Sequence, residues 1–319
     1  MRAVILSARA GGHTTELLRA LTERGHSGDV RPYEGLVATL APVEAGLQTR
    51  LTSGHQTRLT SDHTSILDAD AVFARIIPGG SLEQIIYRVD ALHWIEDRGV
   101  LVVNTPRAIE RCVDKFYTTT LLHDAGLPTP ETVVCERLDE AVAAVEAMGD
   151  VVIKPIFGSL GHGMIRVSEP ELARRVLRPL DQVGSVFYVQ RAIDHGGRDV
   201  RAFVVGGRVL GAIERRAPEG EWRTNVAIGG TARAIDLTPD MEQMALRAAA
   251  VVGADYAGVD LLPSRDGGVF VLEVNGIPGW QGLQEATGLD VATAIVAHAE
   301  RRLESRRSSS MRAEEPLPA

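Results

Sequence analysis

Residues 151–167 read VVIKPIFGSLGHGMIRV, and this stretch decides the fold. An apolar run of strand length ends at a Lys-Pro pair, a glycine-rich loop follows over 157–164, and IRV resumes a strand pattern. Glycines let the backbone approach an anion and turn its N–H groups toward phosphate oxygens. Because no Gly-Lys-Ser/Thr follows, the loop is not a Walker A loop, and it does not stand at the first strand of a dinucleotide-binding unit. Many glycine-rich hairpins bind nothing, so the prediction of a phosphate site here depends on Lys154. The alternative interpretation is that Lys154 is a solvated lysine at the end of a strand.

The residues just before this stretch complete a small α/β unit. They predict a strand over 131–135 and a helix over 138–148. Gly126, Pro128 and Pro130 separate this unit from a helix over 106–126, and such a cluster is typical of a lobe boundary. The unit, about forty residues long, therefore forms a lobe of its own.

The first hundred residues predict a parallel sheet with helices. Apolar runs occur at 2–7, 67–77 and 100–104, and helical patterns lie between them, from about Thr14 or Thr15 onward and over 84–98. Within this part, 48–63 read QTRLTSGH and then QTRLTSDH. Two short copies are too few for a solenoid, so we interpret them as a local duplication in a surface loop or at a strand edge.

The pattern after residue 185 favours strands. Three candidates at 187–193, 199–206 and 208–216 are joined by glycine turns. A helix over about 239–252 precedes two further strands, at 257–264 and 267–275, and a last helix covers about 291–302. The remaining tail shows no periodicity and is expected to be disordered.

The two last strands carry oxygen-bearing side chains among apolar neighbours. Asp260 lies in AGVDLL, and Glu273 and Asn275 lie in VFVLEVN. Residues two apart in a strand face the same side, so Glu273 and Asn275 point together. A buried carboxylate is costly unless it is paired or bound to a metal. Because Mg²⁺ prefers oxygen ligands, this set predicts a magnesium site, the alternative being a salt-bridged strand end.

Arginines lie between the glycine loop and these strands. Arg198 and Arg201 flank Asp199, Arg215 and Arg216 end a strand, and Arg223 follows. Positioned guanidinium groups lower the barrier of a reaction that develops negative charge. Surface arginines are common, so only their arrangement is informative.

Composition limits the function classes. A chain of 319 residues exceeds one average domain, and 45% hydrophobic residues suffice for two or three cores. A formal net charge of −8 argues against a general nucleic-acid binder but allows a basic pocket for one nucleotide. Cys112 and Cys135 lack metal-type spacing. No run approaches a membrane span, and residues 2–7 are too short for a signal peptide, so we expect a soluble, cytoplasmic protein.

The order of these motifs resembles the ATP-grasp superfamily and, more narrowly, the RimK-type glutamate ligases. The resemblance covers about 100–300 and rests on Lys115 in DKFYT, Lys154, the glycine loop, VQRAI, GRDVR, RTNVAIGG, AGVDLL and EVNGIPG. Three stretches, ARIIPGGSLEQ, NTPRAIERCVDKFYT and KPIFGSLGHGMIRV, are similar to the tetrahydromethanopterin:α-L-glutamate ligase subgroup. The resemblance implies an α/β (α+β) ATP-grasp fold: a parallel-sheet lobe at 1–104, a helical connection and small α+β ATP lobe at 105–188, an antiparallel lobe with the metal site at 189–303, and a disordered tail at 304–319.

The resemblance also implies roles for the matching residues. Arg215 would stabilise the transition state, and Arg201, Arg223 and Asn225 would bind substrate. Asp260, Glu273 and Asn275 would bind two Mg²⁺ ions, with Mn²⁺ able to substitute. The family usually has Glu where this chain has Gln190, a change that keeps an acceptor and loses a charge. The residues implied to bind ATP are Lys115, Lys154, Gly158, Ser159, Gly161, Gly163, Gln190, Arg191, Ala192, Asp199, Arg223, Thr224 and Asn225.

The implied reaction is amide formation. ATP would phosphorylate a carboxylate of a small-molecule acceptor, and the amine of L-glutamate or a similar amino acid would attack the acyl phosphate. In the subgroup the acceptor is a pterin carrier of one-carbon units. Two alternatives stay open: a ligase that adds glutamate to a protein, and a nucleotide-binding regulatory module without turnover. We expect a homo-oligomer, a dimer or a tetramer, with neither nucleic acid nor membrane as partner.

Overall fold

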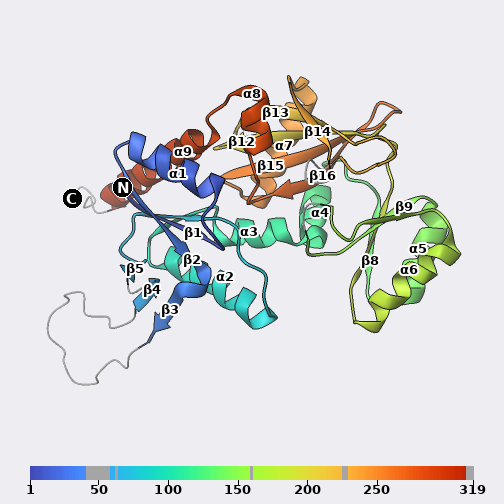
Figure 1. Ribbon diagram of the computed structural model, residues 1–319, viewed down its shortest axis with the longest axis horizontal. Helices are drawn as coiled ribbons and strands as arrows, with labels where there is room; N and C mark the ends of the chain where they lie inside the picture. Colours follow the sequence, from blue (N-terminus) through green and yellow to red (C-terminus); the bar gives the residue numbers. More distant parts are fainter. Residues whose placement is uncertain (41–57, 62–63, 159–160, 225–228, 314–319) are drawn as a thin grey trace, which may run out of the picture. The chain divides into compact units, whose positions relative to one another are not determined.

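The computed structural model describes residues 1–40, 58–61, 64–158, 161–224 and 229–313. The chain divides into two compact units, one made of residues 1–107 with 290–319 and the other of residues 108–289 (Figure 1). The first unit is therefore discontinuous in sequence. In the described residues, no helix combines the length and apolar character needed to cross a membrane.

A four-stranded parallel sheet of order β2-β1-β6-β7 forms the core of the first unit. The strands β1, β6 and β7 read as short apolar runs because both faces are covered, and Ile5, Val72 and Val102 are fully buried, whereas the edge strand β2 is polar. This sheet confirms the expected parallel-sheet lobe. Its elements are β1 (Arg2–Ser7), α1 (Gly12–Glu23), β2 (Ser27–Pro32), β6 (Ala71–Ala74), α2 (Leu82–Asp97) and β7 (Leu101–Val103).

A small antiparallel sheet of order β3-β4-β5 accompanies it in the first unit. Its central strand consists of residues from the second copy of the duplicated octapeptide, and Leu59 there is fully buried. The first copy lies outside the described residues. The elements are the 3-10 helix η1 (Tyr33–Gly35), β3 (Leu36–Thr39), β4 (Arg58–Ser61) and β5 (Thr64–Ser65).

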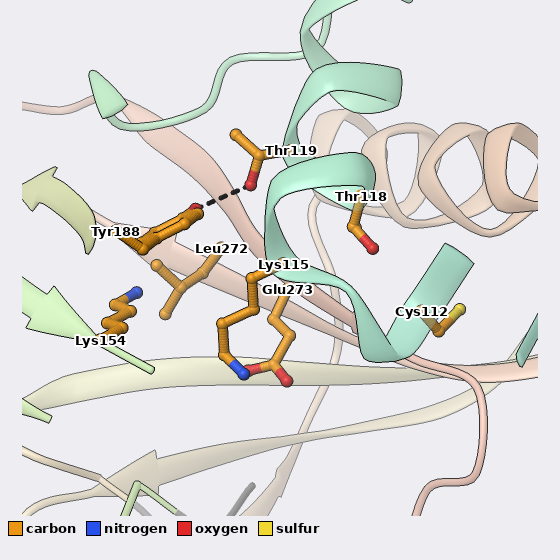
Figure 2. A pocket seen from close by; sticks show the side chains of 8 residues that line it. All are labelled: Cys112, Lys115, Thr118, Thr119, Lys154, Tyr188, Leu272 and Glu273. Carbon is orange, nitrogen blue, oxygen red and sulfur yellow. Dashed lines mark hydrogen bonds between the residues drawn. The ribbon is translucent and has the colours of Figure 1, made fainter. Parts of the chain in front are cut away.

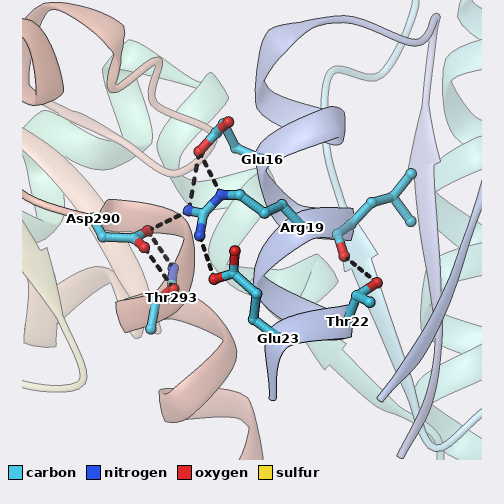
Figure 3. Close-up of polar contacts among 7 residues, drawn as sticks. Glu16, Arg19, Thr22, Glu23, Asp290 and Thr293 are labelled. Carbon is cyan, nitrogen blue, oxygen red and sulfur yellow. Dashed lines mark hydrogen bonds and ion pairs between the residues drawn. The ribbon is translucent and has the colours of Figure 1, made fainter. Parts of the chain in front are cut away.

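The last helix, α9 (Val291–Ala313), also belongs to the first unit and contacts α1 and β7. Figure 3 shows a polar contact at the start of this helix: Arg19 of α1 binds Asp290, the residue before α9, and also Glu16 and Glu23 of its own helix. The distance from Arg19 to Asp290 is 2.8 Å. The expectation of a disordered tail is wrong for 304–313, which are helical, and 314–319 lie outside the described residues. The helix also does not join the C-terminal lobe to which the predicted boundary of 303 assigned it.

The second unit begins with two helices where the sequence predicted one. α3 (Pro106–Val113) ends before Asp114, and α4 (Lys115–Asp124) starts after it. The Asp114 carboxylate accepts the N–H of Tyr117 at 3.0 Å and so caps α4. The break places Lys115 in the first turn of a new helix.

A small antiparallel sheet of order β10-β9-β11-β8 follows, covered by two helices whose apolar residues pack against it. The predicted boundary between 188 and 189 falls inside β11, which pairs with β8 and β9, so we move the end of this lobe to Arg191. The elements are β8 (Thr132–Cys135), α5 (Leu138–Met148), β9 (Val151–Lys154), β10 (Ile165–Val167), α6 (Pro170–Gln182) and β11 (Phe187–Arg191).

The remainder of the second unit is a five-stranded antiparallel sheet of order β14-β13-β12-β15-β16. Apolar residues of one face pack on α7, which leaves the polar side chains of the strands on the other face. Gly206 and Gly207 both have positive φ in the turn between β12 and β13, and a bulge follows Asp260 in the pairing of β15 with β16. The elements are β12 (Arg198–Val205), β13 (Arg208–Arg216), β14 (Thr231–Ile235), α7 (Pro239–Val252), β15 (Tyr256–Pro263), β16 (Val269–Asn275) and α8 (Gln281–Thr287).

Candidate active site

A pocket in the second unit gathers side chains from both of its sheets and from the helices before them. Figure 2 shows the two lysines and Glu273 lying around it, with Tyr188 and Thr119 joined by a hydrogen bond. Leu272 reaches the pocket at the bulge of β16. The lining residues are Cys112, Lys115, Thr118, Thr119, Lys154, Tyr188, Leu272 and Glu273.

Lys154 is a buried lysine, not the solvated strand-end lysine of the alternative interpretation. Its side chain is on the last residue of β9, only 9% of the residue is exposed, and its Nζ donates to Oε1 of Gln190 at 2.6 Å. Burial lowers the pKa of Lys154 to about 8, with the nearby Glu273 opposing that shift and Lys115 adding to it. An ammonium held here with a neutral partner is ready to bind an anion.

Gln190 joins Lys154 to a polar network. Its amide nitrogen donates to the Thr132 hydroxyl at 2.9 Å and to the Tyr188 hydroxyl at 3.1 Å, and Tyr188 shares a 2.8 Å hydrogen bond with Thr119. Burial raises the pKa of Tyr188, so its hydroxyl stays protonated. A glutamate at position 190 would form an ion pair with Lys154, whereas glutamine gives the lysine a neutral acceptor.

The two residues after Gln190, Arg191 and Ala192, are among those that the resemblance implies to bind ATP. Their N–H groups already have backbone acceptors: Arg191 donates to Glu131 at 2.8 Å and Ala192 donates to Asp150 at 2.9 Å. The Arg191 side chain pairs with the Glu131 carboxylate at 2.5 Å. A contact of these two N–H groups with ATP would require both backbone bonds to break, and the role of the two residues in ATP binding stays a prediction.

Lys115 holds the start of the glycine-rich loop. Its Nζ donates to the carbonyl oxygen of Gly158 at 2.7 Å and lies 3.4 Å from that of Ile156. Gly158, Gly161 and Gly163 all have positive φ, a region that glycine adopts without the strain of a Cβ atom. Ser159 lies outside the described residues. The sequence therefore identified a loop whose backbone requires its glycines and whose position depends on Lys115.

The three predicted metal ligands lie together. Asp260 and Glu273 are direct partners in the pairing of β15 with β16, and the Asn275 amide, turned to satisfy its neighbours, donates to Glu273 Oε1 at 3.1 Å. No three His, Cys, Asp or Glu side chains form a metal cluster in the part of the chain that the structure describes. Two carboxylates and an amide are nevertheless a hard oxygen set, which fits Mg²⁺ completed by water and phosphate oxygens.

The contacts of Asp260 also fit the alternative to a metal ligand, which is a carboxylate held in a salt bridge on a strand. Arg201 binds both of its oxygens at 2.7 Å, and Arg215 lies 3.0 Å from Oδ2. Burial alone would raise the pKa of Asp260, but the two guanidinium groups outweigh it and hold the pKa at about 2. Because Glu273 lines the pocket, it is the more accessible of the two carboxylates.

Arg215 and Asp199 form a second buried pair. The guanidinium donates through Nε and Nη2 to the two Asp199 oxygens, at 2.7 and 2.6 Å, and Thr224 donates its hydroxyl to Asp199 at 2.6 Å. The two carboxylates raise the pKa of Arg215 despite its burial. Asp199, which the resemblance implies to bind ATP, is thus held by an arginine and a threonine.

Arg223 connects two loops. Its Nη2 binds Glu221 at 2.6 Å, and its Nη1 lies 3.4 Å from the carbonyl oxygen of Gly161 in the glycine-rich loop. Asn225 lies outside the described residues. Of the eight lining residues, the sequence predicted a site role only for Lys115, Lys154 and Glu273, and it missed the other five, Tyr188 and Thr119 among them. Tyr188 could have been found because it stands two residues before Gln190 on one strand face, and Thr119 because it is one helical turn after Lys115.

The chain is similar to known proteins in sequence and in fold. The family model of the RimK-like ATP-grasp domain matches residues 112–299. The chain is 35% identical over 258 residues to the tetrahydromethanopterin:α-L-glutamate ligase of Methanosarcina acetivorans, covering 72% of this chain and 80% of that one. It is 38% identical over 234 residues to the probable α-L-glutamate ligase of Trichodesmium erythraeum, covering 72% and 78%. The ATP-grasp ligase PsnB, complexed with a phosphomimetic variant of minimal precursor, Mg and ADP, has the same fold, with a TM-score of 0.69 over 94% of this chain and 97% of that one at 21% identity.

The chain therefore belongs to the RimK-like ATP-grasp family and is an ATP-dependent carbon–nitrogen ligase. The expected ATP-grasp fold is confirmed.

Proposed function

We propose that this ligase adds L-glutamate to a carboxylate of a small pterin-type acceptor through an acyl phosphate. ATP would transfer its terminal phosphoryl group to the acceptor carboxylate, giving ADP. The glutamate amine would then displace phosphate, forming the amide and releasing a proton. The likeness to tetrahydromethanopterin:α-L-glutamate ligases, at 35% identity in the first of them, supports this acceptor class.

The observation that carries the proposal is that two lysines and a carboxylate line one pocket. Lys115 comes from α4, Lys154 from β9 and Glu273 from β16, and all three line the same space. Phosphoryl transfer needs positioned positive charge more than it needs covalent chemistry from the protein. Two ammonium groups here would hold the phosphates of ATP in a fixed orientation.

The carboxylate side of the pocket would hold Mg²⁺. Glu273, Asp260 and Asn275 supply the oxygen donors, and the bound ion would neutralise charge on the phosphates. Arg215, buried beside Asp260, would stabilise the transferring phosphoryl group. Arg201 would bind the acceptor or the amino acid, since 21% of its side chain is exposed while its guanidinium lies against Asp260.

The test is phosphate release by the purified protein from ATP in the presence of Mg²⁺. We expect release only when both the acceptor acid and glutamate are present, with one phosphate formed per amide. Omitting either substrate serves as the control. Equal release without either substrate would contradict a ligase.

A protein-modifying ligase that adds glutamate to a protein C-terminus shares every group named above. Intact-mass spectrometry of each acceptor after incubation with ATP and glutamate separates the two: a tetrahydropterin acceptor should gain one glutamyl residue. A mass increase on a protein acceptor alone would favour the alternative. Tight Mg-ATP binding with no turnover on any carboxylate would instead indicate the regulatory module.

A further inference from the structure

The segment that connects β6 to α2 stands at the carboxyl edge of the parallel sheet in the first unit. Its residues, 75–81, read RIIPGGS. Ala8, which follows β1, donates its N–H to the carbonyl oxygen of Ile76 at 2.9 Å, so the segments after β1 and β6 lie side by side. In the order β2-β1-β6-β7, β2 lies on one side of β1 and β6 on the other. Ligands of open parallel sheets bind outside the carboxyl ends of the strands at such a reversal.

A buried arginine holds this segment. Arg88 of α2 is 5% exposed, and its Nη1 donates to the carbonyl oxygen of Pro78 at 2.7 Å and lies 3.3 Å from that of Gly79. Within the part of the chain that the structure describes, no carboxylate pairs with this guanidinium. A buried charge without a counter-charge is costly. A bound anion would supply the counter-charge that Arg88 lacks.

Two glycines leave room beside this guanidinium. A Cβ atom on Gly80 would lie 3.2 Å from Nη1 of Arg88 and would collide with Oε1 of Gln84, so the glycine lets both side chains approach the backbone. A Cβ atom on Gly79 would meet nothing within 4 Å. Because the Gly79 carbonyl oxygen lies 3.3 Å from the same Nη1, this open space adjoins the positive charge.

Exposed apolar side chains accompany the arginine. Ile76, Leu82, Ile85 and Ile86 are each at least 40% exposed. The spacing of three and four residues puts Leu82, Ile85 and Ile86 on one face of α2, and Ile85, three residues before Arg88, is its neighbour on the helix surface. Exposed apolar patches mark interaction sites. An apolar face beside a buried cation suits a ligand that has both a ring system and an anionic group.

We propose that residues 75–81 and the start of α2 recognise the acceptor of the ligase. Arg88 binds an anionic group of that molecule, and the apolar face of Leu82, Ile85 and Ile86 binds its ring system. The inference rests on the function proposed above, in which the acceptor is a pterin-type acid. A subunit contact through the apolar face alone would leave the charge of Arg88 without a counter-charge, whereas an acidic ring compound matches both features.

The binding experiment uses two probes in the absence of ATP. Tetrahydrofolate carries a pterin ring and an acidic tail, whereas tetrahydrobiopterin carries the ring without an anionic group. Arg88→Gln should weaken tetrahydrofolate binding by about tenfold or more in calorimetry, as expected for the loss of a hydrogen bond to a charged group, and leave tetrahydrobiopterin binding unchanged. The double variant Leu82→Gln, Ile86→Gln should weaken the binding of both probes.

Gly79→Leu separates the site from the stability of the fold. Because a side chain at this position meets open space and the φ of Gly79 is not positive, leucine should leave thermal stability unchanged. It should weaken the binding of both probes, since it fills the space beside Arg88. Leu172→Gln is the matched control, because Leu172 is an exposed leucine on α6, in the second unit. It should change neither affinity.

Several outcomes would overturn the inference: no binding of either probe to the wild-type chain, equal weakening of both probes in Arg88→Gln, or unchanged affinity in Gly79→Leu. Analytical ultracentrifugation adds a fourth. A dimer that dissociates in the double variant while probe affinity stays unchanged would make the apolar face a subunit contact. Probe binding through these residues without glutamate transfer would contradict the proposed function alone, and transfer with unaffected variants would contradict this inference alone.

Discussion

At the scale of single residues, the state of Lys154 makes nucleotide binding depend on pH. Its pKa is lowered to about 8 from 10.5, chiefly by burial. Phosphates favour the charged form, so bound ATP should raise this pKa. Below about pH 8 the lysine is already charged and affinity for ATP should be level. Above it, binding must take up a proton, and affinity should fall by up to tenfold per pH unit.

Calorimetry between pH 7 and 9.5, in buffers of different ionisation enthalpy, measures this uptake. Lys154→Met should remove the pH dependence, whereas Lys115→Ala should keep it while weakening binding. Because the unfolded chain binds more protons than the folded one between about pH 8 and 10.5, the same lysine should make stability rise across that range. A flat affinity profile for the wild-type chain would show that Lys154 does not meet the phosphates.

Lys154 and Arg215 should separate binding from chemistry. Lys154→Ala should raise the apparent KM for ATP, because the lysine would hold phosphates in ground state and transition state alike. Arg215→Ala should mainly lower kcat, by about a hundred- to a thousandfold, which corresponds to about 2.7–4 kcal/mol. Nucleotide affinity and single-turnover rates for both variants check this. An Arg215 variant that loses as much affinity as turnover would mean that its role is binding.

The two carboxylates proposed to bind Mg²⁺ should respond differently when each is replaced by its amide. Glu273→Gln should abolish ligation and leave the fold intact, since Glu273 lines the pocket. Asp260→Asn should do the same but also destabilise the fold, because breaking one partner of a buried ion pair typically costs about 3–5 kcal/mol and two arginines lie against Asp260. Denaturant unfolding and Mn²⁺ titration by electron paramagnetic resonance distinguish the effects. Normal turnover of Glu273→Gln at ordinary Mg²⁺ would refute the assignment.

At the scale of elements, the start of α4 determines the position of Lys115. The Asp114 cap fixes the first turn, and Lys115 stands directly after it. Asp114→Ala should cost about 0.5–2 kcal/mol of stability. It should also raise the KM for ATP, because the helical turn that carries Lys115 would no longer be capped. Asp114→Ser retains a capping group and is the control. Thermal unfolding and ATP kinetics measure the two effects. A loss of stability in the alanine variant with an unchanged KM for ATP would contradict the prediction.

The sequence predicted elements and motifs better than it predicted which side chains contact one another. Lys154 was found because it borders a glycine loop, and Glu273 and Asn275 because strands alternate. The contact between Asp199 and Arg215 was missed, since it depends on the register of β12 with β13, which the turn at Gly206 and the bulge after Phe203 determine. Such register is a property of paired strands and is not written in either strand alone.

The break at Asp114 and the length of α9 were missed for a different reason. A capping aspartate inside a helical pattern is indistinguishable from a surface residue until the backbone turns. In α9 the buried apolar residues end at Ala299, and the mainly polar remainder looked disordered. The structure continues the helix there, and the Arg306 guanidinium lies 3.4 Å from the carbonyl oxygen of Gly99 beside β7.

At the scale of the whole molecule, the first unit is built from both ends of the chain. Residues 290–319 group with 1–107, and α9 contacts α1 and β7. Val291, Ile295 and Val296 are at most 1% exposed. Each such side chain contributes about 1.5–3 kcal/mol when it is fully buried, so the three together approach the whole stability of an ordinary domain, about 5–15 kcal/mol. Arg24 and Glu300 add an ion pair at 2.5 Å.

A chain that stops after Leu289 should therefore lose the first unit while residues 108–289 keep their structure. Hydrogen–deuterium exchange should show fast exchange in β1, β6 and β7 and continued protection in β12 and β15. ATP binding should persist in the truncated chain, because every lining residue of the pocket lies within 108–289, whereas ligation should be lost. A chain that lacks only 314–319 is the control and should behave as the full chain. Protected amides in β1 after the longer truncation would mean that α9 is dispensable for the first unit.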